Sequence, residues 1–134
     1  MLLCGVLMSF NEPLMENDSK VRLYFLHERA FFGHEVEITI NHKLLTPLPS
    51  NKYFFVDVEA GNLNIIISGK DKFMEDAEAN ISLEPNQVYY LKIYREIDYF
   101  TNKLYLVRVS EQTAKKAMKS MKLESPAPTI LKNE

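Results

Sequence analysis

The residues best suited to bind a metal or transfer a proton are the three histidines of the chain, His27, His34 and His42. His27 and His34 flank the apolar pair Phe31–Phe32 at opposite strand ends, so their side chains could approach each other. A metal site would need a third ligand, such as Glu28 or Glu35, and none of these residues has a diagnostic ligand spacing. We therefore predict solvated strand-end histidines and no metal site.

A second group of possible ligands lies in a polar loop that carries four carboxylates, Asp71, Glu75, Asp76 and Glu78. Calcium binds several carboxylate and carbonyl oxygens, so this loop is a candidate calcium site. The loop lacks the fixed Asp/Asn/Gly spacing of an EF-hand, and Lys70 and Lys72 offset its charge. We predict a solvated loop without a bound ion.

The chain shows no pattern typical of catalysis. It has no Gly-x-Ser-x-Gly motif and no glycine-rich phosphate loop. Its one cysteine, Cys4, lies in an apolar N-terminal run, where it has no neighbouring histidine and no second cysteine for a disulfide. Glu35 and Glu37 share one strand face and are most simply exposed. We predict no catalytic residue, no cofactor and no enzymatic activity.

Aromatic residues are the most promising binding residues, since the chain has seven Tyr and eight Phe. Tyr89 and Tyr90 are adjacent in a strand, so one of them must point away from the core. We expect most other aromatic side chains to pack between strands and under a helix. The loop aromatics Phe31, Phe32, Tyr99 and Phe100 are the candidates for stacking on a glycan or anchoring a protein partner.

The elements that position these residues are mostly strands. Apolar and polar residues alternate over 20–27, 35–41, 53–58, 63–68, 79–83, 88–94 and 103–109, with a shorter run at 43–45. Two linkers, 59–62 and 84–87, contain Gly61 and the pair Pro85-Asn86, and are predicted to be hairpin turns, with Gly61 at positive φ. The Asn41-His42-Lys43 segment predicts a further tight turn. The fold is predicted to be mostly β, a two-sheet antiparallel β-sandwich of about seven strands.

The period-2 spacing also predicts which side chains form the core. These are Val36, Ile38, Ile40, Val56, Val58, Leu63, Ile65, Ile67, Ile81, Leu83, Leu91 and Ile93. After Ser110 the period changes to that of a helix, with Ala114, Ala117, Met118 and Met121 on one stripe. We expect this short C-terminal α-helix to close an end or edge of the sandwich.

The predicted domain comprises residues 20–122, between an apolar leader remnant with its linker (1–19) and a flexible tail (123–134). Met1 to Phe10 is uncharged and too short to span a bilayer, which takes about 20 apolar residues. Three interpretations are open: the distal half of a signal sequence or anchor, a lipoprotein cysteine at Cys4, or a first edge strand. Leu3 stands where a lipoprotein signal needs a small residue, which disfavours the second.

The order of the segments KVRLYFLH, VEITINHKLL, KYFFVDVEAGNLNIII, LEPNQVYYLKI and SEQTAKKAMKSM carries a resemblance over about residues 20–121. It resembles an uncharacterised family of small bacterial envelope proteins, many of which are lipoproteins or carry signal peptides. The chain departs from that pattern at Leu44 and Leu45, which replace a turn glycine, and at Ala60, which replaces a proline. The full signal sequence of that family is also absent.

The resemblance implies a periplasmic or membrane-anchored location, with membrane contact only through an N-terminal leader or anchor. The function expected is a non-catalytic accessory or binding domain of the bacterial cell envelope, with an unknown protein or glycan partner. The alternative is a cytoplasmic protein–protein interaction module. The net charge of −2, with Lys and Arg spread along the chain, argues against a nucleic-acid partner.

Overall fold

The computed structural model describes residues 19–29, 35–70, 73–124 and 130–131. The predicted leader and linker up to residue 18, the loop aromatics Phe31 and Phe32, and His34 lie outside the described residues. Within the described part, none of the helices is long and apolar enough to cross a membrane.

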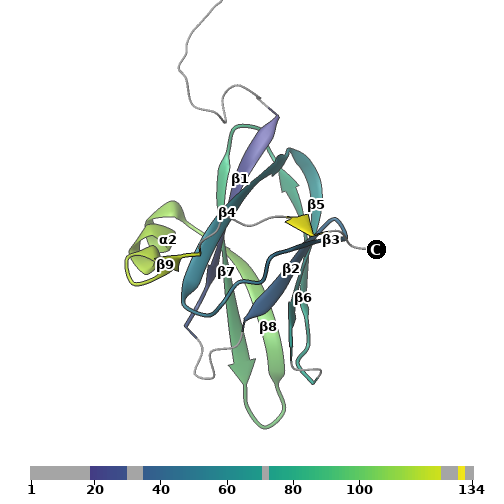
Figure 1. Ribbon diagram of the computed structural model, residues 1–134, viewed down its shortest axis with the longest axis vertical. Coiled ribbons are helices and arrows are strands. Elements are labelled where there is room, and N and C mark those ends of the chain that lie inside the picture. The colour runs from purple at the N-terminus through teal and green to yellow at the C-terminus, as the bar shows by residue number, and fades with distance from the viewer. Residues whose placement is uncertain (1–18, 30–34, 71–72, 125–129, 132–134) are drawn as a thin grey trace, which may run out of the picture.

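Two β-sheets face each other and enclose one core (Figure 1). The first sheet has the strand order β8 (Asn102–Val109), β7 (Val88–Ile97), β1 (Lys20–His27), β4 (Lys52–Glu59) and β9 (Lys122–Leu123). The second has the order β10 (Ile130–Leu131), β3 (Lys43–Leu45), β2 (Val36–Ile40), β5 (Gly61–Gly69) and β6 (Ala77–Leu83). The predicted mostly-β sandwich is confirmed, with several short strands beyond the seven expected.

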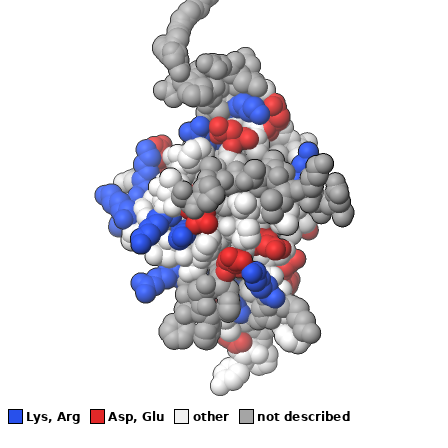
Figure 2. Space-filling view, in the orientation of Figure 1, with Lys and Arg blue, Asp and Glu red and all other residues white. Residues whose placement is uncertain are grey.

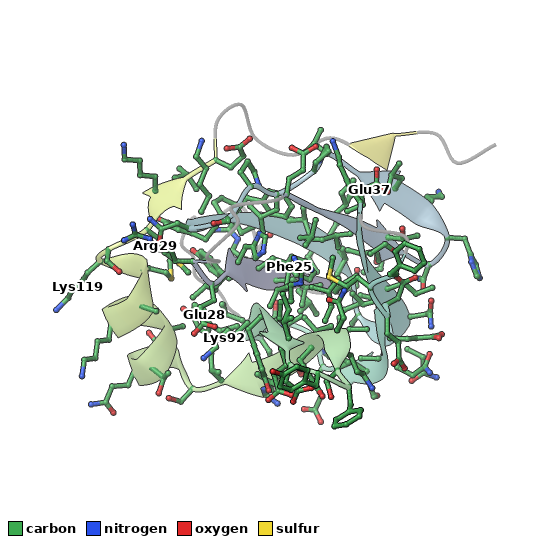
Figure 3. The ribbon with its side chains drawn as sticks, turned by 90° about the horizontal axis from the view of Figure 1, so that it is seen from below. Phe25, Glu28, Arg29, Glu37, Lys92 and Lys119 are labelled. Atoms are coloured by element: carbon green, nitrogen blue, oxygen red, sulfur yellow. The ribbon has the colours of Figure 1, made fainter. Side chains whose placement is uncertain are left out.

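The core between the sheets contains the inward face of every long strand. Of the predicted core residues, Val56, Val58 and Ile81 are partly buried and pack against the core, and the others are buried. Phe25 and Phe54 add the largest fully buried side chains, and their rings meet edge to face with centroids 6.0 Å apart. Figure 3 shows Phe25 at the centre of the sandwich.

The two predicted hairpins, 59–62 and 84–87, are instead crossings from one sheet to the other. β4 pairs with β1 while β5 pairs with β2 and β6, so the turn at Gly61 joins different sheets. The turn at Asn86 likewise leads from β6 to β7. The positive φ expected at Gly61 is confirmed, at +120°, and Asn86 also has a positive φ, of +62°. The hairpin assignment was wrong because alternation shows only which face of a strand is buried. That face is the same whether the next strand pairs with it in one sheet or lies opposite it in the other sheet.

The true hairpins among the described strands are β2–β3, β5–β6 and β7–β8. The β2–β3 turn is the tight turn expected at Asn41 and His42, whose φ values are +48° and +69°. Two pairings, β1 with β7 and β4 with β9, are parallel in a sandwich predicted to be antiparallel. They are possible because each pair is joined by a long crossover through other elements.

The one helix of the described residues, α2 (Glu111–Met118), forms a third layer on the outer face of the first sheet (Figure 1). Ser110 caps it as predicted, since its side chain accepts a hydrogen bond from the Thr113 N–H. Ala114 is fully buried in a second cluster with Leu26 and Tyr90. The helix therefore covers a sheet face and does not close an end or edge, because β1 and β7 present apolar side chains on both faces.

The segment predicted as a flexible tail, 123–134, contributes the second residue of β9 and all of β10 to the described structure. β9 runs parallel to β4, where the Glu124 N–H donates to the Tyr53 carbonyl over 2.8 Å. β10 pairs with β3 in the other sheet. Backbone pairing of this kind needs no apolar pattern, which is why residue types alone do not predict it.

Truncation of the central core residues should be costly. Ile38→Ala and Ile65→Ala should each lower the free energy of unfolding by about 2–5 kcal/mol, because both side chains are fully buried and a cavity would remain. Urea unfolding measures the effect. Ser82→Ala, at an exposed position of β6, is the control and should change stability by less than about 0.5 kcal/mol.

The crossing at Gly61 should resist substitution for backbone reasons alone. A Cβ at this position would meet no atom within 4 Å, so Gly61→Val introduces no clash. Its φ of +120° is nonetheless poorly accessible to a β-branched residue, and we expect a loss of more than about 1 kcal/mol in thermal unfolding. Unchanged stability would show that the crossing tolerates a negative φ.

Candidate functional site

The tip of the β7–β8 hairpin presents two adjacent aromatic side chains to solvent. Tyr99 is 99% exposed and Phe100 is 97% exposed, the highest values among the large hydrophobic residues of the described chain. In Figure 2 the hairpin tip is the white, largely uncharged extremity at the bottom of the molecule. Both residues were predicted as partner-binding aromatics, and the structure places them together.

The backbone beneath these rings is fixed by one carboxylate. Asp98 Oδ1 accepts hydrogen bonds from the Phe100 N–H at 2.8 Å and from the Thr101 N–H at 2.7 Å. The Asp98 N–H in turn donates to the Thr101 carbonyl oxygen. The two backbone N–H donors hold the pKa of Asp98 below its usual value, so the carboxylate stays ionised and keeps the turn closed.

Two more exposed hydrophobic side chains lie at the same end, Ile97 at 52% and Phe73 at 79% exposure. The segment that carries Phe73 is tied to the hairpin, because the Glu75 N–H donates to the Asn102 carbonyl and the Glu75 carbonyl accepts from the Leu104 N–H. We call Phe73, Ile97, Tyr99 and Phe100 the aromatic end.

The other two predicted aromatics, Phe31 and Phe32, belong to the loop between β1 and β2, outside the described residues. His27, the last residue of β1, pairs with Ile93 of β7, and β7 continues from Ile93 to the hairpin tip. The end of β1 that leads into this loop therefore lies toward the aromatic end. Sequence reasoning missed Phe73 and Ile97, because a single apolar residue in a polar loop gives no periodic signal.

Several of the carboxylates considered as metal ligands have structural partners. Glu78 accepts a hydrogen bond from Asn64 Nδ2 at 2.8 Å, and Glu75 pairs with Lys103. Glu28 pairs with Lys92 on the neighbouring strand, as Figure 3 shows. No group of three or more potential metal ligands occurs among the described residues.

His27 corrects the expectation of solvated strand-end histidines. Its side chain is only 3% exposed, and Nδ1 lies 3.0 Å from the Leu48 carbonyl oxygen. A carbonyl can only accept, so Nδ1 carries the proton and donates. Burial lowers the pKa of His27, and the bond to Leu48 opposes this only in part. The histidine is buried because β1 is the middle strand of its sheet. His42 is exposed in its turn, as predicted.

The adjacent tyrosines divide as predicted between the two faces of β7. Tyr89 packs in the core, and its hydroxyl accepts a hydrogen bond from the Glu84 N–H at 3.0 Å. Tyr90 lies in the cluster under α2, stacked on Tyr24 with centroids 5.0 Å apart. These aromatic rings stabilise the fold, whereas Tyr99 and Phe100 are almost fully exposed.

No protein family, curated protein or solved structure matches this chain. The resemblance to small bacterial envelope proteins therefore stays a prediction from the sequence.

Stability should fall when the solution is acidified from about pH 7.5 to about pH 5.5. The unfolded chain protonates His27 near the ordinary pKa of 6.5, whereas the folded chain does so only at lower pH. The unfolded state thus binds more protons below about pH 6.5, and the free energy of unfolding decreases there. Urea titrations at each pH test this. His27→Gln should flatten the dependence, and the exposed-site control His42→Asn should leave it intact.

Proposed function

We propose that this chain is a non-catalytic binding domain of the bacterial cell envelope that engages a protein partner through its aromatic end. The observation that carries the proposal is the near-complete exposure of Tyr99 and Phe100 at a hairpin tip. Hydrogen bonds to Asp98 fix the backbone of that tip. Exposed aromatic anchors on a pre-organised turn lose little entropy when they are buried in a partner.

The arrangement of the two rings favours a protein over a glycan. The ring centroids of Tyr99 and Phe100 are 6.5 Å apart and the ring planes are tilted by 57°. They therefore offer no common flat platform on which one sugar ring could stack. Two divergent rings suit separate apolar pockets in a protein surface.

The non-catalytic part of the proposal is supported by the structural partners of several groups whose pKa values are shifted. The Arg22 pKa is raised by its hydrogen-bonded pair with Asp57, and the Lys115 pKa is raised by its pair with Glu111. The pKa of Asp98 is lowered by turn N–H groups. Each of these three shifts comes from a hydrogen-bonded partner that also holds the local structure in place.

The envelope part of the proposal rests on the resemblance and on the apolar run from Met1 to Phe10 as a leader or anchor. The alternative is a cytoplasmic protein–protein interaction module, which would use the same aromatic end. The two proposed functions differ in the cell compartment and share the same kind of protein–protein contact.

A photo-crosslinking amino acid placed at Tyr99 or Phe100 should capture the partner in living cells of the source bacterium. We expect one discrete adduct from either position, because both rings would enter the interface. The same residue at Ser82, exposed on β6, is the control and should give no such adduct. Equal labelling at position 82 and at the tip, or no adduct at either tip position, would refute the aromatic end as a binding site.

Cell fractionation separates the two compartments. The full-length gene product with a C-terminal tag should appear in the periplasmic or membrane fraction and become sensitive to protease once the outer layers are opened. Recovery in the cytoplasmic fraction, with a crosslinked adduct still formed at Tyr99, would support the alternative module instead.

A further inference from the structure

The outward side of α2 carries a group of lysines. Ala114 and Met118 belong to the apolar cluster between the helix and the first sheet. Successive residues of an α-helix are about 100° apart, so Lys115, Lys116 and Lys119 lie on the side opposite that cluster. All three are exposed. Figure 2 shows Lys and Arg side chains gathered over α2, at the left of the molecule. We call these three lysines the lysine face.

The charge of this region is positive overall. Residues 111–124 contain four lysines and two glutamates. Both glutamates already have lysine partners, since Glu111 pairs with Lys115 at 2.6 Å and Glu124 pairs with Lys52 at 3.1 Å. The local carboxylates therefore neutralise only part of the positive charge on and beside α2.

The residues around the lysine face add to this charge or leave it unchanged. Arg29 is exposed and points out on the same side of the molecule as Lys119 (Figure 3). Lys122, which follows the helix, is also exposed. In the sequence, residues 125–129 contain no Asp or Glu that could offset these cations. The excess of positive charge thus extends beyond the helix itself.

Leu123 supplies an exposed apolar side chain next to these charges. It is 53% exposed. In the β4–β9 ladder it pairs with Tyr53, which packs against the cluster beneath α2. Paired residues of neighbouring strands point to the same side of a sheet, so Leu123 lies on the side that carries α2. Positive charge and an exposed apolar side chain therefore occur on one surface.

This combination fits a lipid bilayer better than a protein or a soluble polyanion. Protein interfaces are depleted in lysine and depend on buried aromatic and arginine anchors, whereas α2 turns its apolar residues toward the sheet. A soluble polyanion would give Leu123 no apolar surroundings. An anionic bilayer offers phosphate headgroups to the lysines and acyl chains to a neighbouring leucine.

We propose that the lysine face, together with Leu123, binds the surface of a bilayer that contains anionic phospholipid. The lysines contact the headgroup phosphates, and Leu123 enters the interface between them. α2 covers a face of the first sheet, whereas the aromatic end lies at one end of the sandwich (Figure 1). The two surfaces are therefore separate, and this inference does not rest on a partner at the aromatic end.

Co-sedimentation of the full chain with vesicles tests the proposal. Vesicles of equal parts phosphatidylglycerol and phosphatidylcholine should bind more strongly than vesicles of phosphatidylcholine alone. Lys116→Gln combined with Lys119→Gln should weaken binding to the anionic vesicles about 10- to 30-fold, because each lysine near an anionic surface contributes about fivefold. Leu123→Thr should weaken it about fivefold, since only part of a leucine side chain is transferred.

The matched control is Lys43→Gln combined with Lys70→Gln, which removes two exposed lysines away from α2 and changes the net charge equally. It should alter binding by less than about twofold, a small change beside that expected for two lysines at the membrane surface. Thermal unfolding should show that each variant remains folded. The apolar run from Met1 to Phe10 is present in every variant, so any binding that it adds is common to both kinds of vesicle.

Salt and a soluble polyphosphate separate the alternatives. Raising the salt from about 0.1 M to about 1 M shortens the Debye length from about 10 Å to about 3 Å and should remove the preference for anionic vesicles. A short DNA duplex should bind more weakly than the anionic vesicles. Equal binding to both kinds of vesicle, or an equal loss in the control variant, would overturn the proposal. Duplex binding as tight as vesicle binding, with no effect of Leu123→Thr on either, would also overturn it and indicate a soluble polyanion.

Discussion

The fold depends on β1, which is paired on both edges, buried on its inner face and apolar on its outer face at Tyr24 and Leu26. β4 and β7 satisfy its backbone groups on either side, while Val21, Leu23 and Phe25 fill the core. The opposite face carries Tyr24 and Leu26, whose apolar surface needs a cover of its own. A strand with two apolar faces thus requires three layers, and α2 supplies the third. The sheets, the helix position and the burial of the strand's last residue all follow from this one strand.

The sequence predicted which face of each strand is buried better than it predicted which strands lie side by side. In β2, Ile38 alternates with outward polar residues, and that pattern alone placed it in the core. The glycine at position 61 indicated a turn with a positive φ. Such a turn occurs both in hairpins and in crossings between sheets, so it did not show which strands pair. The buried state of His27 depends on β1 being central, which no local pattern encodes. Tyr99 was found because it lies between two strands, while Phe73 gave no periodic signal.

The two ends of the sandwich differ in shape. At one end the β7–β8 hairpin carries Tyr99 and Phe100 on a turn that Asp98 closes. At the other end the two sheets leave a hollow of about 350 Å³, with an apolar lining of Ile40, Leu45, Val56, Val58 and Leu63.

The parallel pairing of β1 with β7 also sets the order in which the chain can fold. Leu23 pairs with Tyr89, so β7 cannot join β1 until the intervening strands β2 to β6 have been synthesised. Contacts this distant along the chain slow folding. Until β7 arrives, β1 has an open edge and an uncovered apolar face, the state most prone to aggregate. A domain built in this way is best kept unfolded until its last strands have emerged.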